Sequence, residues 1–137
     1  GTWSILFDSA TSVEIAVDLL DFGVNLHQTD EFESTAIFYA ASVGNASLVR
    51  ALVERGLMPD AVNEHGATPF IYACANDHED VVKLLVDEYG INVNHWSPKI
   101  GTTGIALATG NGNADLVRYL VDRGASDPSF KVSESGS

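Results

Sequence analysis

Three stretches of the chain carry apolar residues at positions i, i+1, i+4 and i+5. Side chains with this spacing lie on one face of a helix that has 3.6 residues per turn. These positions are Leu48, Val49, Leu52 and Val53, then Val81, Val82, Leu85 and Val86, then Leu116, Val117, Leu120 and Val121. Each stretch ends at a glycine, Gly56, Gly90 or Gly124, and glycine often terminates helices. The pattern predicts three short helices, each with one buried face.

A shorter apolar segment precedes each of these helices and opens with a threonine. Thr35, Thr68 and Thr103 are suited to cap a helix, because the hydroxyl oxygen accepts a bond from a free backbone N–H. Pro69 stands at the first helical position, where its missing N–H costs little. Small residues that allow close helix approach fill the middle of these segments: Ala40, Ala41, Ala73, Cys74, Ala108 and Thr109. The expected helices end at left-handed positions held by Gly44, Gly112 and, with some strain, Asp77.

These helix pairs recur with a period close to 33 residues. Thr35 and Thr68 are 33 residues apart, whereas Thr68 and Thr103 are 35 apart. One insertion is expected near Glu88 and Tyr89 and another in the loop before Gly101. Upstream, segment 13–23 repeats the second-helix pattern one period earlier. We therefore predict one repeat domain at 1–128, a flexible tail at 129–137, and units at about 1–29 (degenerate), 30–62, 63–95 and 96–128.

Composition narrows the possible environments and partners. The chain has 137 residues, enough for one domain, and no apolar run approaches the roughly 18 residues that span a bilayer. Cys74 is the only cysteine, so no internal disulfide forms and an intracellular protein, in the cytoplasm or nucleus, is expected. The net charge of −12, with 19 acids against 7 scattered bases, argues against nucleic-acid binding. It favours a basic or neutral protein partner, although an acidic surface serves solubility equally well.

Cys74 and His78 are four residues apart, as in a nucleophile–base pair. However, the repeat places Cys74 where other units have small helix residues, so a buried structural cysteine is expected. His78 occupies the position of Asn45 and Asn113, which favours a polar group that caps the turn. We therefore predict no catalytic residues here.

Two further patterns suggest ligand binding only at first sight. The glycine-rich segment 101–115 lacks the Lys-Ser/Thr pair of a phosphate loop, and its glycines fit helix and turn positions. His27, His65 and His95 fall in successive loops, about 8–10 Å apart if units pack like neighbouring helices. Three ligands of one zinc ion must lie closer together. No cofactor and no metal are expected.

The middle unit carries the fullest version of the repeated motif. Its characteristic residues are Thr68, Pro69, Ala73, His78, Val81, Val82, Leu84, Leu85 and Gly90. At a 33-residue period, this motif resembles the ankyrin repeat, strongly over residues 30–128 and weakly over 1–29. The resemblance implies an all-α solenoid of stacked helix-turn-helix units with protruding β-turn or hairpin loops. The family's usual histidine, two residues after the proline, is replaced by Phe38, Ile71 and Ala106. The bonds that it makes between units must therefore be absent or replaced.

The resemblance also implies a protein-interaction module without catalysis, either a monomer or part of a hetero-complex. Partners of ankyrin-repeat proteins usually lie on the concave face of first helices and turns. The positions carried over are Glu31, Phe32, Ser34, Tyr39, Ser42, Val43, Glu64, His65, Tyr72, Asn76, Trp96, Lys99, Ile100, Leu107 and Asn111. The alternative function is a structural spacer, or an autoinhibitory or targeting arm of a larger multidomain protein.

Tyr39 and Tyr72 are the most specific pair among these positions, because they occupy the same slot one period apart. Tyrosine is enriched in binding hot spots. The two rings either contact a partner or pack between units with their hydroxyls in solvent. With Phe32 and Trp96, they are expected to contact one elongated or helical segment, and alanine at both tyrosines is expected to weaken binding without unfolding. The acids around Phe32 form either a solvated loop or a charged rim: Asp30, Glu31 and Glu33.

Overall fold

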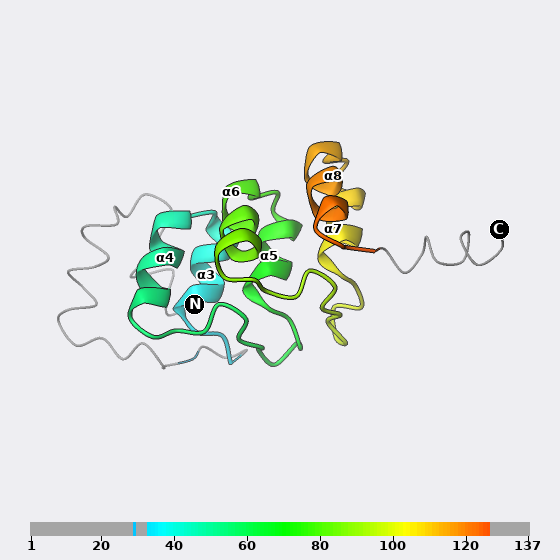
Figure 1. Ribbon diagram of the computed structural model, residues 1–137. Coiled ribbons are helices and arrows are strands. Elements are labelled where there is room, and N and C mark those ends of the chain that lie inside the picture. The colour runs from blue at the N-terminus through cyan, green and yellow to red at the C-terminus, as the bar shows by residue number, and fades with distance from the viewer. Residues whose placement is uncertain (1–28, 30–32, 127–137) are drawn as a thin grey trace, which may run out of the picture.

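The computed structural model describes residue 29 and residues 33–126, and these residues form three successive helix pairs. The pairs are α3 (Ala36–Val43) with α4 (Ala46–Glu54), α5 (Pro69–Ala75) with α6 (Glu79–Lys83) and its continuation η1 (Leu84–Glu88), and α7 (Gly104–Gly110) with α8 (Ala114–Asp122). They stand side by side in chain order, with the connecting loops along one edge (Figure 1). The described part is thus helical, as predicted. The expected first unit and the tail lie outside it.

The first helix of each pair begins where the threonines predict. Thr35, Thr68 and Thr103 are the residues that precede α3, α5 and α7, and Pro69 is the first residue of α5. Only Thr103 caps with its side chain, accepting a bond from the N–H of Ala106 at 3.4 Å. The predicted capping bond is wrong for Thr35 and Thr68, whose buried hydroxyls have no partner. At these two starts the extended backbone, not the hydroxyl, sets the helix boundary.

Each first helix ends in the predicted left-handed turn. The φ angle is 83° at Gly44, 76° at Gly112 and 61° at Asp77. In the first pair, the N–H of Gly44 donates to the carbonyl of Ala41 and that of Asn45 donates to Ala40. The other two turns repeat this bonding, so the chain reverses in the same way at all three. Asp77 is the one non-glycine residue of the three and is therefore the strained one.

The second helices bury the predicted apolar face. Leu48, Val49 and Leu52 are fully buried in α4, and Val81, Val82 and Leu85 are fully buried along α6 and η1. Asn45 and Asn113 cap α4 and α8 by accepting from the N–H three residues on. In α8, Leu116 and Leu120 are buried, but Val121 is 52% exposed.

The second helix of the middle pair contains a π-helical turn, η1. Twelve positions separate His78 from Gly90, against eleven between Asn45 and Gly56, so this helix has one residue more. A turn with i→i+5 bonding accommodates an added residue without ending the helix. The sequence located the insertion near Glu88 and Tyr89, and the structure shows its form.

The core lies between stacked pairs. α5 packs against α3 on one side and against α7 on the other, and small side chains such as Ala40, Ala73 and Ala108 are fully buried between these helices. Gly104 sits directly on Phe70, since a Cβ at Gly104 would lie 2.4 Å from the ring carbon Cε2. Because the first helices pack closely against one another, the accessible surfaces are the loops, the outer side of the first helices and the outer side of the second helices.

Candidate functional site

The predicted partner positions divide into three groups. Glu31 and Phe32 lie outside the described residues, so the aromatic anchor proposed there stays a prediction. A second group makes hydrogen bonds within the protein: Ser34, Ser42, Tyr72, Asn76 and Asn111. The remaining positions are partly or largely exposed on first helices and loops: Tyr39, Val43, Glu64, His65, Trp96, Lys99, Ile100 and Leu107.

Asn63 organises the loop between the first two pairs, a role that the repeat pattern did not reveal. Its amide nitrogen lies 2.9 Å from both Ser34 Oγ and Tyr72 Oη, and its oxygen accepts from the N–H groups of His65 and Ala67. The side chain is buried and uses its donors and acceptor fully. Asn63 thus joins the loop to the start of α3 and to α5.

Tyr72 has a structural role in addition to any contact with a partner. Its ring meets that of Phe38 edge-on, with 6.1 Å between the centroids, and its hydroxyl accepts from Asn63. One of the two predicted alternatives placed this hydroxyl in solvent. That part of the prediction is wrong for Tyr72, because the hydroxyl is bonded to Asn63. Alanine at Tyr72 would remove this packing, so the double alanine substitution confounds binding with stability. Tyr39, the equivalent residue on α3, is also half-buried and packs against the core.

Asn76 and Asn111 fasten each first helix to the one before it. The Asn76 amide donates to the carbonyl and hydroxyl oxygens of Ser42, at 3.0 and 3.1 Å. The Asn111 amide donates to the carbonyls of Cys74 and Ala75, at 3.2 and 2.9 Å. These acceptors lie at helix ends, where carbonyls lack a helical partner. Both asparagines remain exposed, but their donors already have partners within the protein.

Cys74 and His78 do not form a catalytic pair. Cys74 is completely buried, as predicted, and burial raises the pKa of its thiol, with a smaller contribution from the Asp77 carboxylate. A thiol held protonated is a poor nucleophile. The prediction that the His78 side chain caps its turn is wrong. Its Nε2 instead donates to the carbonyl of Ser42 at 2.9 Å. Its ring covers Gly44, where a Cβ would lie 2.4 Å from Nδ1.

Hydrogen bonds join the two loops that connect the helix pairs, 57–67 and 91–102. His95 Nε2 donates to the carbonyl of Gly66 at 2.7 Å, and Ser97 Oγ donates to the carbonyl of His65 at 2.8 Å. The N–H of Lys99 donates to the same carbonyl at 3.3 Å. The second loop also closes on itself through an isolated antiparallel bridge between Ser97 and Thr102. The predicted protruding loops are thus fixed relative to each other.

Large apolar side chains reach solvent mainly from these loops. The exposed fractions are 62% for Met58, 56% for Val62, 49% for Trp96 and 40% for Ile100. Val62 and Met58 were not predicted as binding residues. A signal was present for Val62, because it lies six residues after Gly56 just as Trp96 lies six residues after Gly90.

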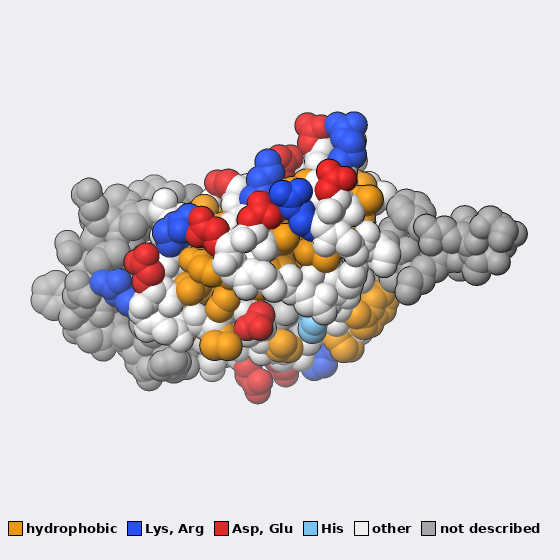
Figure 2. All heavy atoms as spheres, in the orientation of Figure 1, with side chains coloured by type: hydrophobic (Ala, Val, Ile, Leu, Met, Phe, Trp, Pro, Cys, Tyr) orange, Lys and Arg blue, Asp and Glu red, His pale blue; other side chains and the backbone are white. Residues whose placement is uncertain are grey.

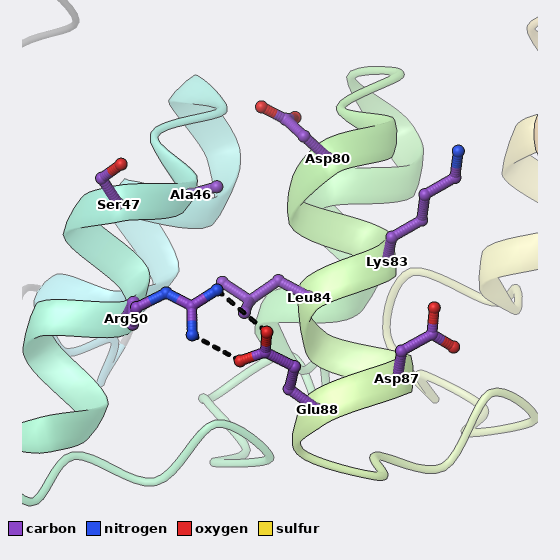
Figure 3. A pocket seen from close by; sticks show the side chains of 8 residues that line it. All are labelled: Ala46, Ser47, Arg50, Asp80, Lys83, Leu84, Asp87 and Glu88. Atoms are coloured by element: carbon purple, nitrogen blue, oxygen red, sulfur yellow. Dashed lines mark hydrogen bonds and ion pairs between the residues drawn. The ribbon is translucent and has the colours of Figure 1, made fainter.

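On the side formed by the second helices, a shallow groove of about 300 Å³ runs between α4 and the α6–η1 helix (Figure 3). Ala46 and Leu84 supply its apolar surface, and the remaining lining is polar: Ser47, Arg50, Asp80, Lys83, Asp87 and Glu88. Arg50 pairs with Glu88 across the groove, and the guanidinium lowers the pKa of that carboxyl. Asp87, the residue before Glu88 in η1, pairs with Arg123 at 3.0 Å. The two acids therefore bind arginines of opposite neighbouring helix pairs.

The charges are arranged differently on the two sides of the described part. Basic side chains gather over the second helices, interspersed with acids (Figure 2). Three of these bases have acidic partners: Arg50, Arg118 and Arg123. Apart from the second helices and the residues that end them, the described residues carry Lys99 as their one base and four acids, Glu33, Asp60, Glu64 and Asp77. None of these four acids is in an ion pair among the described residues.

In the part of the chain that the structure describes, no helix is long and apolar enough to cross a membrane. Histidine, cysteine, aspartate and glutamate side chains of residues 29 and 33–126 do not gather in threes that could hold a metal ion.

Comparison with known proteins decides the family. A family model described as ankyrin repeats, three copies, matches residues 6–97, about two thirds of the chain. The chain belongs to the ankyrin-repeat family. The match stops short of the last helix pair, but α7 and α8 repeat the ankyrin arrangement of the pairs before them. Ankyrin repeats are generally protein-interaction modules rather than catalytic folds.

Several characterised ankyrin-repeat proteins are similar in sequence. Ankyrin repeat and SAM domain-containing protein 6 of Mus musculus is 34% identical over 90 residues, which is 65% of this chain and 10% of that protein. The B-cell lymphoma 3 protein homolog of Mus musculus is 34% identical over 122 residues, 88% of this chain and 25% of that protein. The probable 26S proteasome regulatory subunit p28 of Saccharomyces cerevisiae is 36% identical over 80 residues, 56% of this chain and 34% of that protein. The chain thus spans between a tenth and about a third of the length of these relatives.

Proposed function

We propose that this protein is a binding module, without catalysis of its own, that holds a basic or neutral segment of a partner protein inside the cell. The segment lies against the side formed by the first helices and the loops. The observation that carries the proposal is the unequal use of charge. Among the described residues, the second helices and their ends carry several bases beside their acids, and Arg50, Arg118 and Arg123 are paired with some of these acids, whereas the first helices and loops carry four acids and the single base Lys99. Such an excess of acids favours approach of a positively charged segment.

The helix face supplies the surface that tests this proposal. Tyr39 is half-buried on α3 and lies one repeat before Tyr72. Tyr39→Ala is expected to reduce affinity for a captured partner about tenfold, a loss typical of an aromatic hot spot. Tyr72→Phe keeps the ring against Phe38 and is expected to bind normally.

The experiment is cross-linking and affinity capture from a cell extract, followed by affinity measurement with the purified partner. Asp122→Ala, on the exposed side of α8, is the matched control on the other face and is expected to bind like the wild type. Equal affinity of wild type and Tyr39→Ala would exclude Tyr39 as an anchor. If the wild type captures no partner that competes with untagged protein, the proposed function is wrong.

A second function is suggested by the lengths of the relatives. One relative's name records a SAM domain beside its ankyrin repeats, and the chain covers only a tenth of that protein. The same fold would then act as a spacer or as an autoinhibitory or targeting arm of a larger protein. Binding of the purified repeats to another part of their own polypeptide, in preference to a separate protein, would favour this alternative.

A further inference from the structure

We infer that the two connecting loops, more than the helix-lined face, anchor the partner. Met58, Val62, Trp96 and Ile100, here called the loop ridge, would receive the apolar side chains of a linear, basic segment of another protein. This inference rests on the proposed function and adds the location of the anchor and the chemistry of the segment. It follows from exposure, rigidity, spacing and charge.

Exposure singles out the loop ridge. Within the described residues, five large apolar side chains are strongly exposed, and four of them belong to the ridge. The fifth, Val121, stands on α8. Figure 2 shows apolar side chains and acids together along the lower edge of the molecule. Figure 1 places the loops at this same edge. Exposed apolar groups that cluster, instead of standing singly, mark binding surfaces.

The loops hold these side chains on a fixed backbone. Three hydrogen bonds connect 91–102 to the carbonyls of His65 and Gly66, and Pro98 packs so closely on Gly66 that a Cβ there would lie 2.5 Å from Pro98 Cδ. On the other side, Asn63 ties the first loop to Ser34 and Tyr72. Little ordering of the loops is then required on binding, which preserves the affinity gained from apolar contact.

The spacing indicates a linear occupant. Val62 and Trp96 occupy equivalent positions in the two successive connecting loops, and stacked helices lie about 8–10 Å apart. An extended segment advances about 3.3 Å per residue, so every third side chain would meet an equivalent slot. The helix-lined face offers fewer unused groups, because the amides of Asn76 and Asn111 already bond within the protein.

The charges indicate the chemistry of the segment. Asp60 and Glu64 lie in the same loop as Met58 and Val62, are exposed, and have no ion-pair partner among the described residues. Lys99 is the one base of the two loops. Lysine or arginine residues between the apolar anchors of the segment would complement these acids, whereas an acidic segment or an anionic lipid surface would be repelled.

The test is selection of binders from a random library of 12-residue peptides, followed by fluorescence anisotropy with the selected peptides. We expect these peptides to combine lysine or arginine with apolar residues three apart. Trp96→Ala and Val62→Ser should each weaken binding about tenfold or more, and Glu64→Lys should weaken it further at low salt. Val121→Ser is the matched control, since Val121 and Val62 are similarly exposed, and it should bind like the wild type. Circular dichroism of each variant verifies the fold.

Other outcomes would overturn the inference. Selected peptides that lose affinity with Tyr39→Ala but not with the ridge variants would place the anchor on the helix face and leave the proposed function intact. Failure to select any peptide, or selection of acidic peptides, would exclude a basic linear segment as the occupant. The proposed binding function would still be tested separately by capture of a partner protein. A dimer in sedimentation that Trp96→Ala dissociates would identify a second copy as the occupant. Binding to neutral vesicles that the same substitution abolishes would identify a membrane.

Discussion

Asparagine side chains carry much of the bonding between neighbouring units at the residue scale. Asn76 and Asn111 donate to carbonyls of the preceding helix, and Asn94 both donates to Gly124 and accepts from Ser126. An amide offers donors and an acceptor together, so one side chain can satisfy backbone groups on two segments. A typical bond of this kind contributes about 1 kcal/mol net, but an unsatisfied buried partner costs more.

Asn63→Ala is expected to lower the free energy of unfolding by about 3 kcal/mol, because four bonds are lost and buried groups lose their partners. Asn63→Asp should lose less than half as much. The carboxylate still accepts from the two N–H groups, and the hydroxyls of Ser34 and Tyr72 can turn to donate. Urea denaturation monitored by circular dichroism measures both effects. A loss below about 0.5 kcal/mol for Asn63→Ala would contradict the role assigned to Asn63.

Burial of Cys74 and Tyr119 predicts a loss of stability in alkaline solution. Burial raises the pKa of the Cys74 thiol above its ordinary value of about 9, and burial together with the nearby Asp87 carboxylate raises the pKa of Tyr119 to about 12. Both groups therefore stay protonated in the folded protein while the unfolded chain ionises. Their contribution to stability is complete below pH 9 and is lost progressively as the pH rises toward 12.

Urea denaturation at several pH values between 7 and 11 would measure this loss. Cys74→Ala, which places in α5 the residue found at the equivalent position of α3, should make the alkaline decline less steep. Iodoacetamide should modify native Cys74 only as fast as the protein unfolds. Rapid modification of the native protein at pH 8 would show that the thiol is accessible.

At the scale of the element, α7 approaches α5 so closely that it tolerates no side chain at Gly104. A Cβ would lie 2.4 Å from the Phe70 ring and 2.9 Å from Cys74 Sγ. Gly104→Ala should therefore destabilise the protein by about 1–3 kcal/mol through overpacking. Gly110→Ala, in the same helix, meets open space and should be neutral or slightly stabilising, since alanine favours the helix. Thermal denaturation of these two variants separates the effect of packing from that of helix propensity. Equal changes in Tm for Gly104→Ala and Gly110→Ala would contradict overpacking at Gly104.

Residue type and spacing were sufficient to predict most helix boundaries. Thr68 with Pro69 and the glycines at 44, 56, 112 and 124 fix local backbone conformations, so they mark helix ends before any packing is known. The π-helical form of η1 was not predictable, because an added residue can equally be placed in a loop. The bond of Asn63 to Ser34 and that of His78 to Ser42 form only when units stack, and a repeat pattern does not report which side chains meet.

At the scale of the whole molecule, stability should vary along the stack. Contacts link each pair to its neighbours, so α5 is covered by first helices on both sides, whereas α8 presents an exposed Val121. Hydrogen exchange followed by mass spectrometry should show the slowest exchange in α5. Gly104→Ala should accelerate exchange in α7 and α8 more than in α3 and α4. Uniform acceleration over residues 33–126 would indicate a single cooperative unit instead.

The candidate surface was predictable in outline and less so in its residues. Lys99, Ile100 and Trp96 were predicted in a loop and are exposed there, because loop residues follow directly from the repeat. Ser34 was predicted with them but is buried against Asn63. Burial of one loop by the next depends on bonds across units, so exposure within loops required the three-dimensional arrangement.

The π-helical turn has a consequence for how this protein can be rearranged. Asp87 and Glu88 pair with arginines on opposite sides, Arg123 of the following module and Arg50 of the preceding one. Duplicating the middle module would leave Glu88 opposite Lys83, which occupies the slot of Arg50, but would set Asp87 against Tyr89, which occupies the slot of Arg123. The modules are therefore not fully interchangeable.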